Sequence, residues 1–233
     1  MDSAVRKHLT WRDATVIDAR SESSTARTLT LDVPDWIDQI GGQHIDLRLT
    51  ADDGYQANRS YSISSGPGER PEITVEKVED GEVSPFIVED VEVGDTLEVR
   101  GPIGGYFVWD GTNNSPLLLI GGGSGVAPLR SIWRAAAGTV PITVLYSART
   151  RDRVVYADEL ANNADLDARV HLSREDADGY VHGRIDGAAI ADAVGDTKPL
   201  VYVCGPTAFV EAMVTDLAAA GLDPTTIRTE RFG

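Results

Sequence analysis

The sequence predicts two domains of different class: a small antiparallel barrel or sandwich, followed by a doubly wound α/β domain with a parallel sheet. Short, alternating, β-branched segments fill the first half of the chain, whereas strands alternate with helices from Leu117 onward. A polar, turn-rich stretch at 110–116 separates the two patterns. Charge divides at the same place, since residues 1–111 carry a net −12 and residues 112–233 a net −4.

In the first domain, residues 1–111, we expect six strands and one short helix. The strands are expected at 12–20, 26–33, 43–50, 59–64, 71–79 and 95–100. The helix is expected at 84–90, with Ser84 as its N-cap and Pro85 as its first helical residue. The near-regular spacing of turn residues between the strands is typical of a barrel or sandwich.

In the second domain, residues 112–233, we expect five parallel strands. They begin near residues 117, 142, 169, 200 and 226, and each interval fits a strand, a crossover helix and a return. Ala-rich helices at 128–137 and 207–220 suit close packing against a sheet. The domain is therefore predicted to be a doubly wound α/β fold.

Composition excludes several classes of function. The net charge of the 233 residues is −16, which argues against a nucleic-acid partner because such binding depends on Lys and Arg. One cysteine and four histidines without ligand spacing predict no metal site and no four-thiolate iron-sulfur cluster. A charged N-terminal stretch without an apolar run predicts no signal peptide, no membrane segment and a cytoplasmic location.

The segment LLLIGGGSGVAPL, residues 117–129, carries the strongest chemical signal. Glycines let the backbone approach a phosphate, and the free N–H groups at a helix start supply positive potential. The segment lacks the last glycine of GxGxxG, where Val126 stands, and the lysine of a nucleotide-hydrolysing loop. We interpret it as an anion cradle, and the alternative is a glycine-rich turn without a ligand.

Two segments of the first domain are also candidates. On the strand that contains RSYSISS, alternation puts Arg59 and Tyr61 on one face, where a guanidinium could hold phosphate and a phenol ring could stack on an aromatic ring. The turn GEVS, residues 81–84, could offer further backbone N–H groups to a pyrophosphate. The alternatives are an ordinary strand and an ordinary helix start.

The ordered set RSYS, GEVS, GPIGGYF, GGGSGVAP, YSAR, VCGP and ERF resembles the ferredoxin-NADP reductase superfamily, the flavin-containing NAD(P)H reductases. The resemblance runs from about Trp11 to Phe232. It implies a Greek-key barrel that binds a flavin, FAD in preference to FMN, followed by an α/β domain that binds NADPH or NADH.

The resemblance implies a flavin site in the barrel. Its members are Arg59, Ser60, Tyr61, Ser62, Gly81, Val83 and Ser84. By resemblance, Arg59 contacts the flavin's phosphates, Tyr61 stacks on the isoalloxazine and Ser62 hydrogen-bonds near N5 as a catalytic residue. Strict alternation turns Ser62 away from Tyr61, so its placement rests on the resemblance alone.

The resemblance also implies a nicotinamide-nucleotide site in the second domain. Its members are Gly121, Gly122, Gly123, Ser124 and Gly125 under the pyrophosphate, and Cys204, Gly205 and Pro206 beside the nicotinamide. Ser173 and Arg174, with Arg184 nearby, resemble a 2′-phosphate site, which favours NADPH over NADH. The alternatives are a buried small side chain at Cys204 and a solvated arginine at a strand end.

The C-terminal segment completes the predicted catalytic set of Ser62, Cys204, Glu230 and Phe232. By resemblance, Phe232 covers the flavin face that the nicotinamide must reach, so it would have to move, and Glu230 lies near the flavin. The alternative is that both residues only end the last strand.

The resemblance implies an enzyme that takes a hydride from NAD(P)H onto FAD and passes electrons to a separate acceptor, such as a ferredoxin, a flavodoxin or an oxygenase component. One alternative is a flavin reductase that uses free flavin as its substrate. Another is a non-catalytic subunit that senses nucleotide or assembles a complex.

Overall fold

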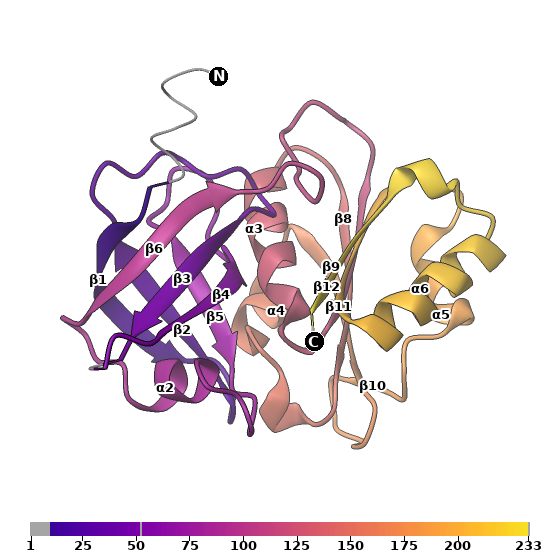
Figure 1. The fold of residues 1–233 in the computed structure, drawn as a ribbon. Helices are drawn as coiled ribbons and strands as arrows, with labels where there is room; N and C mark the ends of the chain where they lie inside the picture. The colour runs from indigo at the N-terminus through magenta and orange to yellow at the C-terminus, as the bar shows by residue number, and fades with distance from the viewer. Residues whose placement is uncertain (1–9, 52, 233) are drawn as a thin grey trace.

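A computed structural model describes residues 10–51 and 53–232 of the chain. A β-barrel and a layered α/β domain lie side by side, with α3 and α4 between the two sheets (Figure 1). The predicted absence of a signal peptide is based on residues 1–13, of which residues 1–9 lie outside the described residues.

The first sheet is the predicted six-stranded antiparallel barrel. Its strands are β1 (Arg12–Ser21), β2 (Ala26–Asp32), β3 (His44–Thr50), β4 (Gln56–Ser62), β5 (Glu72–Glu76) and β6 (Thr96–Ile103). Their order is β4-β3-β6-β1-β2-β5, and an antiparallel bridge between Ile63 and Ile73 joins the two edges. Alternate side chains, such as Ile45 and Leu47 of β3, are fully buried and form the barrel core.

Helix α2 (Ser84–Glu89) packs against β2 and β5 and buries Ile87 in the barrel core. The predicted N-cap role of Ser84 is wrong, because the helix already includes Ser84 and Val83 precedes it without a side-chain cap. The Ser84 hydroxyl instead accepts a hydrogen bond from the N–H of Val78 at 3.1 Å. It therefore closes the turn before the helix.

The second sheet is parallel and has six strands. They are β7 (Leu117–Gly122), β8 (Ile142–Ala148), β9 (Leu166–Leu172), β10 (Val181–His182), β11 (Leu200–Pro206) and β12 (Ile227–Phe232), in the order β10-β9-β8-β7-β11-β12. The predicted count of five is corrected by β10, a two-residue edge strand. Both of its residues are exposed, so no apolar pattern marks it in the sequence.

Helices cover both faces of this sheet, as a doubly wound fold requires. They are α3 (Val126–Ala136), α4 (Ala157–Asn162), α5 (Gly187–Val194) and α6 (Thr207–Ala219), and the short 3₁₀ turns are η1 (Gly123–Gly125), η2 (Arg151–Arg153) and η3 (Pro224–Thr226). Leu117 and Leu119 of β7 pack with α3 and α4, whereas Leu118 and Ile120 pack with α5 and α6. Alternate residues of one strand thus serve two cores.

Two buried polar side chains of α3, Arg130 and Ser131, join the two domains. The Arg130 guanidinium contacts Glu72 of β5 at 2.6 Å and Glu159 of α4 at 2.7 Å, and its side chain is only 5% exposed. Burial opposes ionisation of Glu72, but hydrogen bonds from Arg20 and Arg130 outweigh it and lower the pKa of this carboxyl to about 2. The Ser131 hydroxyl donates to the carbonyl of Ser65 at 2.7 Å. These contacts fix α3 against the barrel.

Within the described residues, every helix is too short or too polar to cross a membrane.

Candidate functional site

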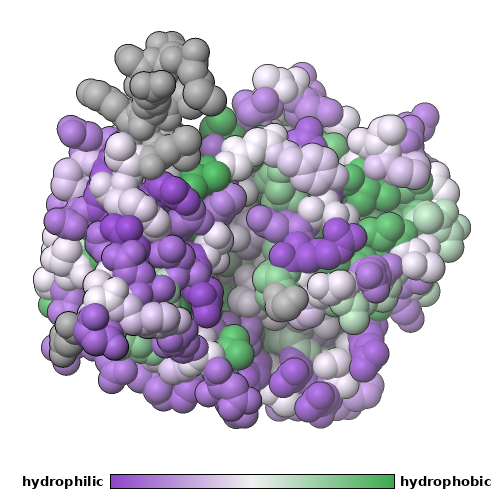
Figure 2. Space-filling view, in the orientation of Figure 1, coloured by the Kyte–Doolittle hydropathy of each residue, from purple (hydrophilic) through white to green (hydrophobic). Residues whose placement is uncertain are grey.

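Two cavities meet between the barrel and the parallel sheet, where the molecular surface is hollowed between its two halves (Figure 2). The central cavity, of about 390 Å³, is lined by β4, the 81–84 turn and the start of α3. The sheet-edge cavity, of about 600 Å³, lies at the carboxyl ends of β7, β8, β9 and β11. Both cavities are lined by Glu76, Val78, Ser124 and Phe232. The two cavities therefore share part of their walls.

Strand β4 brings its four predicted residues to the central cavity, which is lined by Arg59, Ser60, Tyr61 and Ser62. Burial raises the pKa of Tyr61 to about 12, although the charge of Arg59 opposes this, so the phenol stays neutral. The Arg59 guanidinium lies 3.7 Å from the Glu82 carboxylate and is half exposed. The hydroxyl of Ser60 donates to Asp46 of β3 at 2.7 Å.

The 81–84 turn brings Gly81, Val83 and Ser84 to the same cavity. A Cβ atom on Gly81 would lie 2.9 Å from both the Val78 carbonyl oxygen and the Ser84 hydroxyl oxygen. The turn thus requires glycine at this position, and its backbone lies open to the cavity. A backbone cradle next to an arginine suits a diphosphate.

The glycine-rich segment divides into cavity-lining and packing positions. Gly122, Gly123 and Ser124 line the sheet-edge cavity, and Gly123 has a φ of 56°, which favours glycine. Gly121 and Gly125 instead allow close packing: a Cβ on Gly121 would lie 3.1 Å from Leu129, and one on Gly125 would lie 2.2 Å from the carbonyl oxygen of Cys204.

A carboxylate already occupies the predicted anion cradle. The N–H of Ser124 donates to the Glu76 side chain at 3.1 Å. This contact demonstrates that the turn presents a donor to a negative charge, as its position ahead of α3 leads us to expect. Sequence analysis missed Glu76, because only the fold brings the end of β5 to the glycine segment.

Cys204 and Glu230 are paired in the register of β11 and β12 but line neither cavity. Burial, with a smaller contribution from Glu230, raises the pKa of the Cys204 thiol well above its usual value, so the thiol stays neutral. Burial also raises the pKa of Glu230 to about 7, and its Oε2 atom has no hydrogen-bond partner among the described residues. The carboxyl of Glu230 can therefore gain or lose a proton near neutral pH.

The loops after the strands bring some predicted residues together and leave others apart. Ser173, Pro206 and Phe232 line the sheet-edge cavity, whereas Gly205, Arg174 and Arg184 do not. Arg174 and Arg184 are exposed at the surface.

Two further arginines line the sheet-edge cavity and were missed, Arg149 and Arg153. The N–H of Arg174 donates to the carbonyl of Arg149 at 2.9 Å, so the two chain segments are neighbours. The segment YSAR, at the carboxyl end of the second parallel strand, was the available signal for Arg149. The cavity thus has two arginines on the same side as Ser173, and Glu76, Glu79 and Asp80 also line it.

In the part of the chain that the structure describes, no group of three or more His, Cys, Asp or Glu side chains is arranged to hold a metal ion.

Two family models match the chain. That of the oxidoreductase FAD-binding domain matches residues 13–108, and that of the oxidoreductase NAD-binding domain matches residues 119–215. The first match covers the central cavity's β4 and 81–84 turn, and the second covers the glycine-rich segment. Both cavities are therefore lined by residues of the two matched domains.

Individual proteins are similar over most of the chain. A component of the 1,2-phenylacetyl-CoA epoxidase of Escherichia coli K12 is 30% identical, over 96% of this chain and 68% of the relative. Ferredoxin-NADP reductase B of Sorangium cellulosum is 32% identical, over 82% of this chain and 84% of the relative. The solved FAD/NAD-binding domain of nitric oxide dioxygenase from Vibrio cholerae has a TM-score of 0.84 at 26% identity, and the match covers 95% of this chain and 98% of that one. The chain spans about half the length of several other curated relatives.

Proposed function

This chain belongs to the ferredoxin-NADP reductase superfamily of FAD-dependent oxidoreductases, and we propose that it carries electrons from NADPH to a separate oxygenase component. One observation carries the proposal: Ser124 and Phe232 line both cavities, so a flavin in the central cavity would meet a nicotinamide in the sheet-edge cavity. Hydride transfer requires reacting atoms about 3–3.5 Å apart, and a shared wall supplies that proximity.

The residues of the central cavity fit FAD. When bound, FAD accepts a hydride and releases electrons singly, which the protein's own side chains do not do. Arg59 and the backbone of the 81–84 turn bind the diphosphate, and Tyr61 orients the ring system by stacking. Ser62, at the end of β4, donates its hydroxyl to the ring edge.

The residues at the end of the parallel sheet govern access and protons. Phe232 is 36% exposed and shields the central cavity from water, so it moves aside when the nicotinamide enters. Glu230, two positions before Phe232 on β12, can hold a proton near neutral pH because burial raises its pKa to about 7. Cys204 and Gly205 support the adjoining strand end, where the nicotinamide ring lies.

NADPH is the coenzyme that this cavity suits. Gly122, Gly123 and Ser124 hold its diphosphate on backbone N–H groups. Ser173, Arg149 and Arg153 provide a hydroxyl and two guanidinium groups for the 2′-phosphate. Arg174 and Arg184 lie outside this cavity, exposed at the same end of the sheet, where they add positive charge near its entrance residue Ser173.

An oxygenase component suits the electron-accepting side. The Escherichia coli relative is part of an epoxidase, and the Sorangium cellulosum relative is named for its action with ferredoxin. The net charge of −16 disfavours docking of a strongly acidic ferredoxin. A cytoplasmic location is part of this proposal, because one cysteine excludes the intrachain disulfide framework typical of small secreted domains.

The test is an anaerobic titration of the purified, desalted protein with NADPH and, in parallel, with NADH. We expect a yellow protein whose flavin absorbance bleaches at lower concentrations of NADPH than of NADH. A colourless protein that still consumes NADPH with added flavin would support the flavin-reductase alternative. Bound flavin that neither coenzyme bleaches would support a non-catalytic subunit.

A further inference from the structure

The tip of the hairpin between β1 and β2 touches the α/β domain at η2. The N–H of Ser24 donates to the carbonyl of Asp152 at 2.9 Å, so the backbones of the two domains are joined here. The Ser24 hydroxyl donates to the Asp152 carboxylate at 2.6 Å, and the Arg153 guanidinium donates to the Thr25 hydroxyl at 3.1 Å. Arg153 lines the sheet-edge cavity, so two barrel residues hold a segment of the proposed coenzyme site.

The hairpin gives Arg153 a fixed anchor. Its turn is closed by a hydrogen bond from the N–H of Glu22 to the carbonyl of Ala26 at 2.9 Å. The carbonyl of Thr25 accepts the N–H of Lys77 at 2.8 Å, which extends the pairing of β2 with β5 by one residue. The Thr25 hydroxyl therefore has a defined place at the edge of the barrel.

Asp152 and Arg153 are adjacent in sequence and opposite in charge, yet their side chains lie apart. Nε of Arg153 is 3.9 Å from Oδ2 of Asp152, too far for a hydrogen bond. Oδ2 accepts the Ser24 hydroxyl instead, and Oδ1 accepts the Thr150 hydroxyl at 2.5 Å. These two hydrogen bonds favour the charged carboxylate and hold the pKa of Asp152 below its usual value. Ser24 thus helps to keep the carboxylate away from Arg153.

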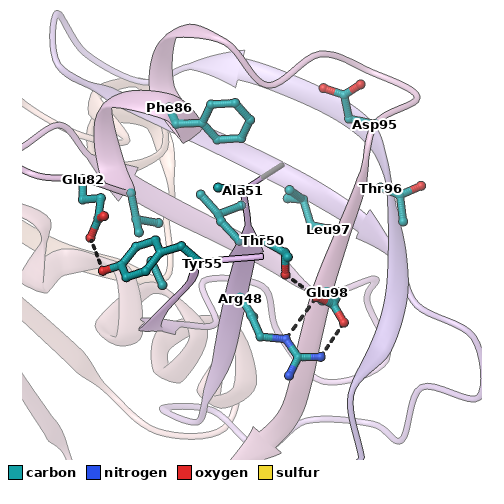
Figure 3. A pocket seen from close by; sticks show the side chains of 13 residues that line it. Arg48, Thr50, Ala51, Tyr55, Glu82, Phe86, Asp95, Thr96, Leu97 and Glu98 are labelled. Carbon is teal, nitrogen blue, oxygen red and sulfur yellow. Dashed lines mark hydrogen bonds and ion pairs between the residues drawn. The ribbon is translucent and has the colours of Figure 1, made fainter. Parts of the chain in front are cut away.

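A guanidinium that is held by a neutral hydroxyl keeps its charge for a ligand. Arg48, by contrast, lies 2.5 Å from the Glu98 carboxylate, which compensates its charge (Figure 3). The sheet-edge cavity also has three carboxylates on its walls, with which an unanchored arginine could pair. The Thr25 hydroxyl fixes the position of Arg153 and adds no negative charge.

We propose that Ser24 and Thr25 are positioning residues for the 2′-phosphate of NADPH, because they keep the Asp152 carboxylate and the Arg153 guanidinium apart. Arg153 then presents an uncompensated charge to the phosphate. This inference rests on the proposed function, which takes Arg153 as a ligand of that phosphate. It adds a role for the barrel, whose hairpin takes part in selecting NADPH over NADH. NADH carries a neutral hydroxyl at this position and gains little from the charge.

The experiment uses calorimetric titration of the FAD-loaded chain with adenosine 2′,5′-bisphosphate and with adenosine 5′-monophosphate, which differ only in the 2′-phosphate. The variants are Ser24→Ala and Thr25→Val, and Thr25→Ser restores the hydroxyl. The matched control is Ser21→Ala, at an exposed position of β1 whose hydroxyl makes no hydrogen bond with any described residue. We expect Ser24→Ala and Thr25→Val to weaken binding of the bisphosphate by about three- to tenfold and that of the monophosphate by less than about twofold. Thr25→Ser and Ser21→Ala should bind both ligands as the wild type does.

A double-mutant cycle with Arg153→Gln tests whether the hydroxyl of Thr25 acts through Arg153. Arg153→Gln should weaken binding of the bisphosphate alone. Thr25→Val should then have no further effect in the Arg153→Gln background, because the group that it positions is gone. Thermal melting of each variant monitors folding.

Three results would overturn the inference: unchanged binding of the bisphosphate in both Ser24→Ala and Thr25→Val, equal weakening of the two ligands, or an effect of Thr25→Val that is as large without Arg153 as with it. If Arg153→Gln still weakens the bisphosphate alone, the proposed function stands in each of these cases. A wild-type chain that binds the bisphosphate no more tightly than the monophosphate would overturn the proposed preference for NADPH and this inference together.

Discussion

Glu76 is a residue whose contact opposes the binding of a coenzyme. Its carboxylate accepts the Ser124 N–H that the coenzyme's diphosphate is proposed to use, and it lines both the central and the sheet-edge cavity. A coenzyme must therefore displace a charge of its own sign.

We expect Glu76→Gln to lower the dissociation constant of NADP⁺ by about three- to tenfold at low ionic strength, because the amide keeps the shape and loses the charge. The measurement is a titration of the FAD-loaded protein followed by its difference absorbance. Glu79→Gln is the control, since Glu79 is an exposed carboxylate of the same cavity without the Ser124 contact. Weaker binding by Glu76→Gln would instead mean that the carboxylate helps to hold the coenzyme.

Glu230 is expected to make the stability of the chain depend on pH. Its pKa of about 7 in the folded chain lies above the ordinary 4.5, so the folded state binds the extra proton between these values. The stabilisation is fully present below about pH 4.5 and is lost as the pH rises through 7.

Between about pH 5 and about pH 8, the free energy of unfolding of the wild type should therefore fall by on the order of 2–3 kcal/mol more than that of Glu230→Gln. Urea unfolding of the flavin-free chain at several pH values measures this decrease. Glu211→Gln, a change at an exposed position of α6, should leave the pH profile of the wild type intact. Parallel profiles for wild type and Glu230→Gln would contradict the prediction.

At the scale of elements, η1 can pack against β11 only because Gly125 has no Cβ atom. A methyl group on Gly125 would lie 2.2 Å from the carbonyl oxygen of Cys204, which is backbone and has no rotamer to change. We expect Gly125→Ala to lower the melting temperature, with a loss of about 1–3 kcal/mol, and to weaken NADP⁺ binding as the glycine segment shifts. Differential scanning calorimetry and coenzyme titration measure the two effects. Gly105→Ala, with no atom within 4 Å of the added carbon, should change neither.

The elements were predictable where one face of a strand is buried. The alternation of Ile45 and Leu47 marks β3 in the sequence, and the continuous apolar run of β7 marks a strand buried on both faces. Strand β10 and the position of Ser84 in α2 were not predictable, because neither leaves an apolar pattern and both depend on neighbouring segments. The boundary between residues 111 and 112 stays a prediction.

The candidate site was predictable where a motif carries it. RSYS, GEVS and the glycine-rich segment each place several residues on a cavity wall. Glu76 and Arg149 lie outside the segments from which roles were inferred. Their places follow from the ends of strands that the chain brings together over long separations. Local pattern therefore indicated which chain segments line the cavities, and tertiary structure added the side chains around them.

At the scale of the whole molecule, the buried Arg130 side chain holds the two domains together through its ion pairs. Arg130→Met would leave the partly buried carboxylates of Glu72 and Glu159 with one cationic partner fewer each. Because Glu72 keeps Arg20 and Glu159 keeps Arg134, we expect a loss of about 1–3 kcal/mol, and the two domains should then unfold in separate transitions. Calorimetry with the flavin-free chain measures both. Arg169→Met, at an ion pair with exposed Asp167 and Asp192, should cost less than about 1 kcal/mol, and equal losses would contradict the argument.

The Arg130 cluster is also shielded from dissolved ions, because its guanidinium is 5% exposed, whereas a net −16 is spread over the chain as a whole. Concentrated electrolyte screens outward charges and scarcely reaches buried ones. A high salt concentration would therefore change the association rate of charged partners with this protein. It would leave the angle between the two domains as it is in dilute buffer. The rate at which charged partners bind therefore depends on the salt concentration, whereas the orientation of the two domains does not.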